Sequence, residues 1–346
     1  MKNITTIVFL VFVLASCQKE KITFGTNVSE TFYLDNSEAS MRVLVEGNTS
    51  SHTFLIFVHG GPGLSSFFYN TDYISQNIEN KYAVVYWDQR NAGASQGNSN
   101  GDHLNLIQMT DDLKKLIQLI KSRYGQDSGI FILGHSFGGL LTASFMTTGN
   151  NQSMVKGWIF ADGSHNYPLN DTLTQQMLLT VGQQQIALNK NVSSWKPIVD
   201  YCNNHKGNFT FEESIQLGSY AADAETYFES VEKITLATLI KKDPIEYKWP
   251  VTAILLNMNY STNSSFNREL AITELSTKLG IVTIPTLLLY GKYDFICPGG
   301  LEDDVYKRIN TTDKKLAISP ISGHDIMLQD ESFFCREVNA FIERHK

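Results

Sequence analysis

The stretch "GIFILGHSFGGLL", residues 129–141, places the hydroxyl of Ser136 between two glycines, where one apolar run ends and another begins. The first run is short and apolar, which indicates a buried strand, and the second has the length of a helix. A sharp turn from strand to helix strains its middle residue, and flanking glycines let the backbone approach closely. We therefore expect Ser136 to project from the carboxyl edge of a sheet as a nucleophile.

Short apolar runs and amphipathic segments alternate on both sides of this stretch. Further buried strands are expected at residues 53–60, 82–88, 155–162, 284–291 and 314–320. Helices are expected at residues 104–125, where apolar side chains recur three and four positions apart, and at residues 326–345. Strands alternating with helices predict an α/β fold, with a mostly parallel central sheet covered by helices on both faces.

Residues 164–280 interrupt this alternation. The segment is polar, rich in Gln and Asn and mostly helical in pattern, with no convincing buried strand. We interpret it as a helical cap inserted over the carboxyl edge of the sheet. The predicted organisation is therefore a first part of the core at residues 17–163, the cap at residues 164–280, and a second part of the core at residues 281–346.

The serine needs partners, because a hydroxyl is a weak nucleophile until a base takes its proton. In a fold with this turn, the acid and then the histidine follow the serine along the chain. Asp294 comes three residues after the glycine that ends the strand at 284–291, and His324 follows the strand at 314–320 in a Ser-Gly-His turn. We predict a triad of Ser136, Asp294 and His324. Asp162, at the end of the strand after the nucleophile helix, is the alternative acid.

Two backbone N–H groups are candidates for stabilising an oxyanion at Ser136. The N–H of Phe137 lies at the start of the predicted helix, whose N-terminus favours negative charge. The loop "HGGPG", residues 59–63, follows an earlier strand, and its glycines let N–H groups turn inward. Gly61 is the expected second donor, and His59 is expected to brace the loop.

The start of the chain has the pattern of an export signal. Lys2 precedes nine apolar residues, 7–15, which are too few for a transmembrane helix of about 20. Residues 14–17, Leu-Ala-Ser-Cys, resemble the lipoprotein box of bacteria, in which the cysteine becomes the lipid-carrying N-terminus. This resemblance implies a signal peptide at residues 1–16, a lipid anchor at Cys17 and export to the membrane of the cell envelope.

Composition narrows the function classes. The net charge of −7 argues against a nucleic-acid partner, which requires a basic face, but it is compatible with a cationic substrate. The cysteines, Cys17, Cys202, Cys297 and Cys335, have no Cys-x-x-Cys spacing, so no metal site is predicted. Packing is the expected role of the last three, and one disulfide among them is the alternative.

Several motifs together resemble the α/β-hydrolase superfamily and, within it, the proline iminopeptidase branch of serine peptidases. They are "HGGPG", "VVYWDQRNAGASQG" at residues 84–97, the turn at Ser136, "GKYDFICP" at residues 291–298 and "SGHD" at residues 322–325. Asp88 and Arg90 belong to the most branch-specific of these motifs, and we expect them to brace the edge of the pocket. Asn91 stands where the family has a glycine.

The resemblance implies that carboxylates of the cap bind the free N-terminal amine of a substrate. "YAADAETYFES", residues 220–230, resembles the family's stretch in which an aromatic residue precedes a key glutamate, which places Glu229 at the amine site. A solvated glutamate is the alternative role for this residue. "ILLNMNYS", residues 254–261, matches a second stretch, but Asn257 stands where the family has a glutamate.

These observations predict a serine hydrolase that needs no metal or organic cofactor. The resemblance implies an aminopeptidase, similar to proline iminopeptidases, that acts on short peptides or amino-acid amides with a free N-terminus. An esterase of small acyl esters is the first alternative. A non-catalytic binding lipoprotein of the same fold is the second, although a binding protein has no need for Ser136, Asp294 and His324 together.

Overall fold

The computed structural model describes residues 24–97, 101–205, 208–234 and 263–346. The predicted signal peptide, Cys17 and Asn257 therefore lie outside the described residues. Within the four ranges, no helix is long and apolar enough to cross a membrane.

The described residues form a nine-stranded sheet in the order β1-β2-β4-β3-β6-β7-β8-β9, with β5 paired to β2. Its strands are β1 (Val28–Asn36), β2 (Ala39–Gly47), β3 (Thr53–Val58), β4 (Ala83–Trp87), β5 (Gln96–Gly97), β6 (Gly129–Ser136), β7 (Gly157–Gly163), β8 (Thr286–Gly291) and β9 (Lys314–Ser319). All pairs from β4 to β9 along this order are parallel, whereas β1, β2 and β5 pair antiparallel. The mostly parallel sheet predicted from the sequence is confirmed.

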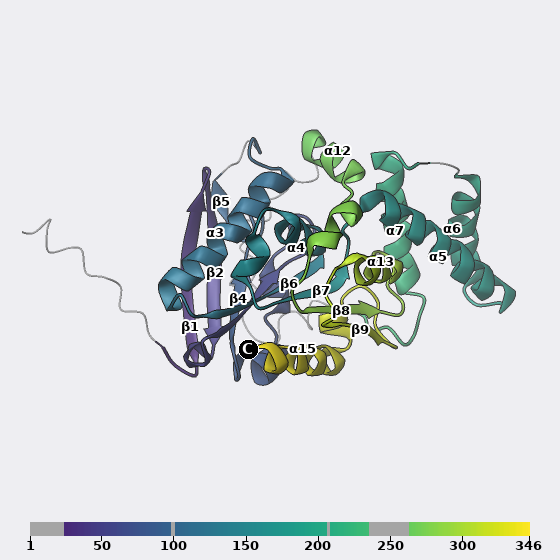
Figure 1. Cartoon of the computed structure of the whole chain (residues 1–346). Helices are drawn as coiled ribbons and strands as arrows, with labels where there is room; N and C mark the ends of the chain where they lie inside the picture. The colour runs from purple at the N-terminus through teal and green to yellow at the C-terminus, as the bar shows by residue number, and fades with distance from the viewer. Residues whose placement is uncertain (1–23, 98–100, 206–207, 235–262) are drawn as a thin grey trace, which may run out of the picture.

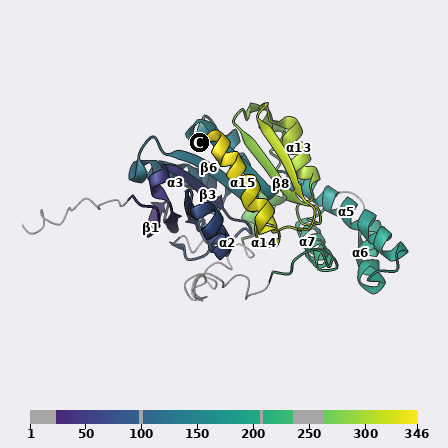
Figure 2. The same ribbon diagram turned by 90° about the horizontal axis from the view of Figure 1, so that it is seen from below.

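Helices cover both faces of this sheet (Figure 1). Those of the core are α2 (Asp72–Ile74), α3 (Leu106–Tyr124), α4 (Phe137–Thr147), α13 (Gly300–Arg308), α14 (Ile326–Gln329) and α15 (Glu331–His345). Side chains of a strand alternate between faces, so Phe54 and Ile56 of β3 share a buried cluster with α3 and α4. Leu55 and Phe57 share the opposite cluster with α14 and α15. Figure 2 shows α15 lying across that face.

The antiparallel hairpin of β1 and β2 is not predicted from the sequence. The two residues at its turn, Ser37 and Glu38, have positive φ angles of 43° and 64°. A turn with two positive φ angles is usually recognised by Asn-Gly or Asp-Gly, and neither dipeptide is present here. In addition, β1 is an edge strand with alternating exposure, so it lacks the continuous apolar run that marks the parallel strands.

The C-terminal helix expected at residues 326–345 is divided in two. Asp330 separates α14 from α15 and has a non-helical φ of −142°. Its side chain accepts a hydrogen bond from the N–H of Phe333 and so caps the start of α15. An aspartate inside an apolar periodic pattern is therefore the local reason for the break.

Helices also stand between β7 and β8, where the cap is expected. Those described are α5 (Tyr167–Ala187), α6 (Val192–Asn204), α7 (Phe211–Glu225) and α12 (Ser264–Ile272). Figure 1 shows α5, α6 and α7 together at one end of the molecule, beside α13 and β8. Trp195 of α6 and Leu217 of α7 are buried in one cluster with Phe295, which belongs to the loop after β8. The cap is therefore packed directly against the segment that carries Asp294.

The last described part of the expected cap also contacts the core. Phe266 and Leu270 of α12 belong to the same buried cluster as α3 and α4. Leu275 and Leu279, which follow in the chain, belong to it as well. Helix α12 therefore packs on the core as well as on α5 and α7 of the cap, and the boundary at residue 280 stays a prediction.

Candidate active site

The strand-to-helix turn predicted at Ser136 is present. β6 ends at Ser136 and α4 begins at Phe137, and Ser136 has φ 55° and ψ −123°, a strained conformation for a residue with a side chain. A Cβ atom at Gly134 would lie 2.3 Å from the carbonyl oxygen of Gly138. One at Gly138 would lie 2.0 Å from the carbonyl oxygen of Val58 in β3. The turn therefore requires both glycines that flank the hydroxyl.

Asp294 and His324 meet at the carboxyl edge of the sheet, as their positions after β8 and β9 predict. His324 Nδ1 donates to Asp294 Oδ2 over 3.0 Å, and both side chains are buried. The other carboxylate oxygen, Oδ1, accepts from the N–H groups of Ile296 at 2.9 Å and Cys297 at 2.7 Å. These bonds fix the carboxylate, and a proton on Nδ1 leaves Nε2 of the imidazole available as a base.

The electrostatics of this pair favour a protonated imidazole. Burial by itself disfavours the charged form of His324. The Asp294 carboxylate and the hydrogen bond to it outweigh burial, so the pKa of His324 is raised above the usual value for histidine. An imidazole in this setting is a stronger base than a free one.

Asp162, the alternative acid, has a different set of contacts. Its Oδ1 accepts from the N–H of Gly291 at 2.8 Å, and its Oδ2 accepts from the N–H of Ile326 at 3.1 Å. Gly291 ends β8 and Ile326 begins α14, so this carboxyl joins the two segments that carry Asp294 and His324. The geometry assigns the histidine contact to Asp294 and a bracing position to Asp162.

His135 precedes the serine and connects the strand-to-helix turn at Ser136, which we call the elbow, to His324. The sequence did not predict this contact. Its Nε2–H donates to the carbonyl oxygen of His324 at 2.8 Å, and the hydroxyl of Tyr69 donates to its Nδ1 at 2.7 Å. The N–H of Gly60 donates in turn to Tyr69 Oη at 3.5 Å. Burial, with the nearby charge of His324, lowers the pKa of His135 to about 4, so it remains a neutral structural link.

The loop "HGGPG" is held in place by a buried histidine, as predicted. His59 Nδ1–H donates to the carbonyl oxygen of Gly60 at 2.8 Å, and its Nε2 accepts from the N–H of Gln89 at 3.1 Å. Burial lowers the pKa of His59, so the ring stays neutral with this tautomer. Gly61 has a φ of 119°, a conformation that favours glycine.

The Asp-Gln-Arg stretch braces the same region through buried ion pairs, in line with its expected role. Asp88 Oδ2 accepts from Arg42 at 2.6 Å, and its Oδ1 accepts from the hydroxyl of Ser65 at 2.7 Å. Arg90 pairs with Asp112 of α3 at 2.6 Å. These contacts connect the loop after β4 to β2, to the loop after β3 and to α3.

A cavity of about 490 Å³ lies between the elbow and the cap. Its core side includes Ser136, Phe137 and Gly61, which are the expected nucleophile and the two expected oxyanion donors. Helices α5, α7 and α12 supply most of the other side. The remaining lining residues are Pro62, Leu64, Ser164, Tyr167, Asn170, Asp171, Thr174, Phe211, Ser214, Ile215, Leu217, Gly218, Asn267, Leu270, Ala271, Ile296 and Cys297.

Among the described residues that line this cavity, Asp171 of α5 carries the one carboxyl group. The side chain is 9% exposed, and its Oδ1 accepts from the hydroxyl of Ser214 in α7 at 2.7 Å. Burial raises the pKa of Asp171 and outweighs the hydrogen bond from Ser214 and the charge of His205, which act in the opposite direction. A further positive charge beside this carboxyl would stabilise its ionised form. The sequence offers no signal for this residue beyond its place in the predicted helical cap.

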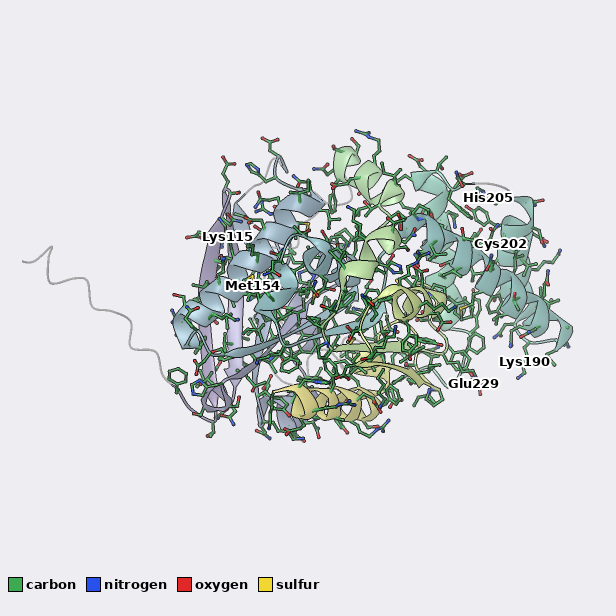
Figure 3. The ribbon with its side chains drawn as sticks, viewed as in Figure 1. Lys115, Met154, Lys190, Cys202, His205 and Glu229 are labelled. Atoms are coloured by element: carbon green, nitrogen blue, oxygen red, sulfur yellow. The ribbon has the colours of Figure 1, made fainter. Side chains whose placement is uncertain are left out.

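Glu229, the predicted amine ligand, does not line the cavity. It lies in a turn after α7 with an exposed side chain, and Figure 3 shows it at the edge of the molecule. The glutamate of this stretch that reaches the triad loops is Glu225, one helical turn earlier and 8% exposed. Of the two expected positions, Glu229 is thus placed on the surface, and Asn257 lies outside the described residues.

The other reactive groups in the described part of the chain are possible metal ligands and cysteine thiols. In the described ranges, no group of three or more His, Cys, Asp or Glu side chains is arranged to hold a metal ion. Cys202, Cys297 and Cys335 are buried and unpaired, in agreement with a packing role. Burial, with the charge of Asp294, raises the pKa of the Cys297 thiol, which keeps it protonated beside the cavity.

Comparison with known proteins places the chain in a family. A family model described as serine aminopeptidase, S33, matches residues 49–242, more than half of the chain. A probable aminopeptidase, YbaC, of Bacillus subtilis is 21% identical over 310 residues, covering 88% of this chain and 93% of the relative. A proline iminopeptidase of Saccharolobus solfataricus is 25% identical over 303 residues, covering 85% and 86%.

Solved structures share the fold. A proline iminopeptidase from Mycobacterium smegmatis matches with a TM-score of 0.61 and 14% identity, over 91% of this chain and 98% of the other. An esterase from Exiguobacterium antarcticum matches with a TM-score of 0.56 and 17% identity, over 88% and 96%. The chain therefore belongs to the serine aminopeptidase S33 family and is a hydrolase with the α/β-hydrolase fold.

Proposed function

We propose that this protein is a serine aminopeptidase that releases an N-terminal residue from short peptides through a triad of Ser136, Asp294 and His324. The strained elbow at Ser136 and the bond between Asp294 and His324 support the triad. The S33 family and its aminopeptidase relatives support the choice of substrate class.

The first half of the reaction forms an acyl-enzyme. Ser136 Oγ attacks the carbonyl carbon of the first peptide bond, and its proton passes to Nε2 of His324. Asp294 holds the ring by Nδ1 and stabilises the imidazolium. The N–H groups of Gly61 and Phe137, which both border the cavity, stabilise the oxyanion. The imidazolium then gives its proton to the leaving amine as the C–N bond breaks.

The second half returns the enzyme to its starting state. The N-terminal residue is now an ester on Ser136, and a water molecule attacks its carbonyl carbon while His324 takes the proton. The ester bond breaks, Ser136 Oγ recovers a proton from His324, and the free amino acid leaves. These steps call on no metal and no organic cofactor.

Asp171 is the observation that carries the choice of an aminopeptidase over an esterase. An α-ammonium group that enters the cavity loses water and needs a charged partner, because an unpaired buried charge costs several kcal/mol. Asp171 offers a buried carboxyl in the cavity that also contains Ser136. A small uncharged ester has no use for such a group.

We further propose that the protein is exported and anchored to the cell-envelope membrane by lipid on Cys17. The support is the sequence of residues 1–17, with its basic start, apolar run and Leu-Ala-Ser-Cys end. Mass spectrometry of the mature protein from the membrane fraction tests this proposal. Lipidated Cys17 is expected, with loss of membrane partition in Cys17→Ser, and an unmodified Cys17 in that fraction would contradict the anchor.

Substrate class is tested by one panel on the purified protein. Proline and alanine arylamides with free amines are compared with their N-acetylated forms and with short-chain p-nitrophenyl esters. We expect kcat/KM for free-amine arylamides to exceed that for N-acetylated ones by about 10- to 100-fold, the effect of one ion pair in a desolvated site. Equal rates on N-acetylated amides would reject the aminopeptidase, and hydrolysis of the esters alone would make the protein an esterase.

A further inference from the structure

Glu225 extends from the cap to the two loops of the expected triad. It is the last residue of α7, and its side chain is buried. Its Oε1 accepts from the N–H of Phe295 at 3.3 Å, and its Oε2 accepts from the N–H of His324 at 3.2 Å. Phe295 directly follows Asp294 in the chain. One carboxyl group of the cap therefore holds the backbone beside the acid and the backbone of the histidine itself.

The approach of this carboxyl to the histidine loop depends on a glycine. A Cβ atom at Gly323 would lie 2.5 Å from Glu225 Oε2, so a side chain at this position would displace the carboxyl. Gly323 lies in the Ser-Gly-His turn before His324, where its φ is not in the left-handed region. The close approach of Glu225, and not the backbone conformation, thus accounts for this glycine.

The residues just after α7 also pack through an aromatic side chain on the loop that carries Asp294, the acid loop. Phe228 stacks on Tyr293, with ring centroids 4.6 Å apart, and on Phe295 at 5.7 Å. These two rings flank Asp294 in sequence. On the core side, the acid and histidine loops are joined by the N–H of Tyr293, which donates to the carbonyl oxygen of Ser322 at 3.0 Å. Glu225 adds a connection between the same loops from the side of the cap.

The position of Glu225 is electrostatically costly. Burial and the neighbouring Asp294 carboxylate raise the pKa of Glu225 above the usual range of a glutamate, whereas His324 and its N–H oppose this shift. A contact that only held the cap in place could be made by apolar side chains without this cost. A carboxyl is needed where two N–H groups, on two different loops, must be held at one separation.

We propose that Glu225 is a positioning residue that sets the distance between Asp294 and His324, so that the docked cap completes the triad. The proposal rests on the proposed function insofar as these two residues are the catalytic acid and base. Glu225 acts through backbone groups and does not border the cavity that holds the substrate.

The first test replaces Glu225 by Gln, which keeps the size of the side chain but turns one acceptor into a donor. We expect kcat for the best arylamide to fall by about 10- to 100-fold with KM nearly unchanged, as for a small misplacement of catalytic groups. The low-field proton resonance of His324 Nδ1–H should shift or broaden. Asp223→Asn is the matched control, because Asp223 is an exposed carboxylate on the same helix, and it should behave as the wild type.

A second pair of variants tests the same contact by changing Gly323. Gly323→Ala places a methyl group against Glu225 Oε2 and should lower kcat and disturb the His324 resonance in the same way. In a Glu225→Ala background the clash is gone, so Gly323→Ala should then cost little further activity. Such non-additivity identifies the contact itself as the cause.

The outcomes separate this proposal from the proposed function. If Glu225→Gln and Gly323→Ala keep the wild-type kcat and the wild-type His324 resonance, Glu225 does not position the pair. A fall in melting temperature with kcat and resonance unchanged would also overturn the proposal, since it indicates a merely structural contact. If instead the wild type has no hydrolase activity, the proposed function fails, and the resonance still reports whether Glu225 sets the geometry of Asp294 and His324.

Discussion

The elbow and the cap face each other across one cavity, but different constraints build them. At the elbow, backbone geometry decides which residues fit, because Ser136 has a positive φ and a Cβ at Gly134 or Gly138 would overlap a carbonyl oxygen. In the cap, single side chains on helices decide the chemistry. Asp171 comes from α5, and Glu225 comes from the end of α7.

This difference determines what a substitution should do in each region. The elbow holds groups that take part in bond making, so their loss should remove the reaction. The cap holds groups that select a substrate or position a catalytic loop, so their loss should change kcat/KM more moderately. The predictions below test this division, beginning with the largest expected effect.

Removing the nucleophile should have the largest effect. Ser136→Ala is expected to abolish labelling by a fluorophosphonate probe and to lower kcat by about 10⁴- to 10⁶-fold, as when one member of a cooperating triad is lost. His324→Ala should do nearly the same. Labelling followed on a gel and arylamide hydrolysis are the measurements.

Ser164→Ala is the control for this experiment, because Ser164 borders the same cavity directly after β7. Its hydroxyl has no role in the proposed reaction, so labelling should persist. Labelling that survives Ser136→Ala but disappears in Ser164→Ala would move the nucleophile away from the elbow.

The two candidate acids should behave differently. Asp294→Asn is expected to lower kcat by about 10³- to 10⁴-fold, since the amide no longer stabilises the imidazolium. Asp162→Asn leaves the His324 contact intact but loses one of two N–H bonds that join the loops, so it should mainly destabilise the fold by about 1–3 kcal/mol. Kinetics and thermal unfolding of both variants decide the matter. A dead Asp162→Asn enzyme beside a nearly normal Asp294→Asn enzyme would exchange the assignments.

The pH dependence of kcat/KM tests the assignment of Asp294 in a second way. His324 accepts a proton only when neutral, so kcat/KM should fall as pH decreases through its pKa. Asp294 raises that pKa, so the acidic limb of the wild-type pH profile should lie at a higher pH than the usual pKa of a histidine. Removal of the carboxylate charge in Asp294→Asn should move the limb of the residual activity to lower pH. A limb that stays in place would show that Asp294 does not act on His324.

In the cap, Asp171 and Glu229 provide a matched pair of carboxylates. Asp171→Asn is expected to lower kcat/KM for free-amine arylamides by about 10- to 100-fold through loss of one buried ion pair. N-acetylated substrates should be affected little. Glu229→Gln should leave both substrates at wild-type rates, because that side chain is exposed. The opposite result would restore Glu229 as the amine ligand and exclude Asp171.

The sequence predicts those features whose backbone geometry requires particular residue types at fixed positions along the chain. The parallel strands have continuous apolar runs, the elbow has glycines on both sides of its serine, and Asp294 and His324 follow successive strands. Such features depend on position along the chain, so a single sequence reveals them. The β1–β2 hairpin has Ser37 and Glu38 at its turn and an alternating edge strand, so neither signal was available there.

In the cap, sequence reasoning could not choose among similar residues. Glu225 and Glu229 lie four positions apart in one polar stretch, and the burial of the first depends on how α7 packs on the loop after β8. Asp171 and Ser214 come from different helices and meet only in the folded protein. The contact between His135 and the carbonyl oxygen of His324 spans 189 positions of the chain and involves a backbone acceptor that any residue would supply.

That last contact gives the prediction with the smallest effect. Tyr69 donates its hydroxyl proton to His135 Nδ1, and His135 in turn holds the backbone of His324. Tyr69→Phe leaves a buried acceptor without its donor but keeps the stacking of the ring on Phe57, so it should destabilise the fold by about 1 kcal/mol. If the same free energy is lost in positioning His324, kcat falls by about fivefold.

Tyr33→Phe, on the exposed edge strand β1, is the control and should change neither the stability nor kcat. Loss of stability at constant kcat would restrict the Tyr69–His135 link to the fold, whereas a drop in kcat of the size expected for Asp294→Asn would place it among the catalytic groups of the elbow.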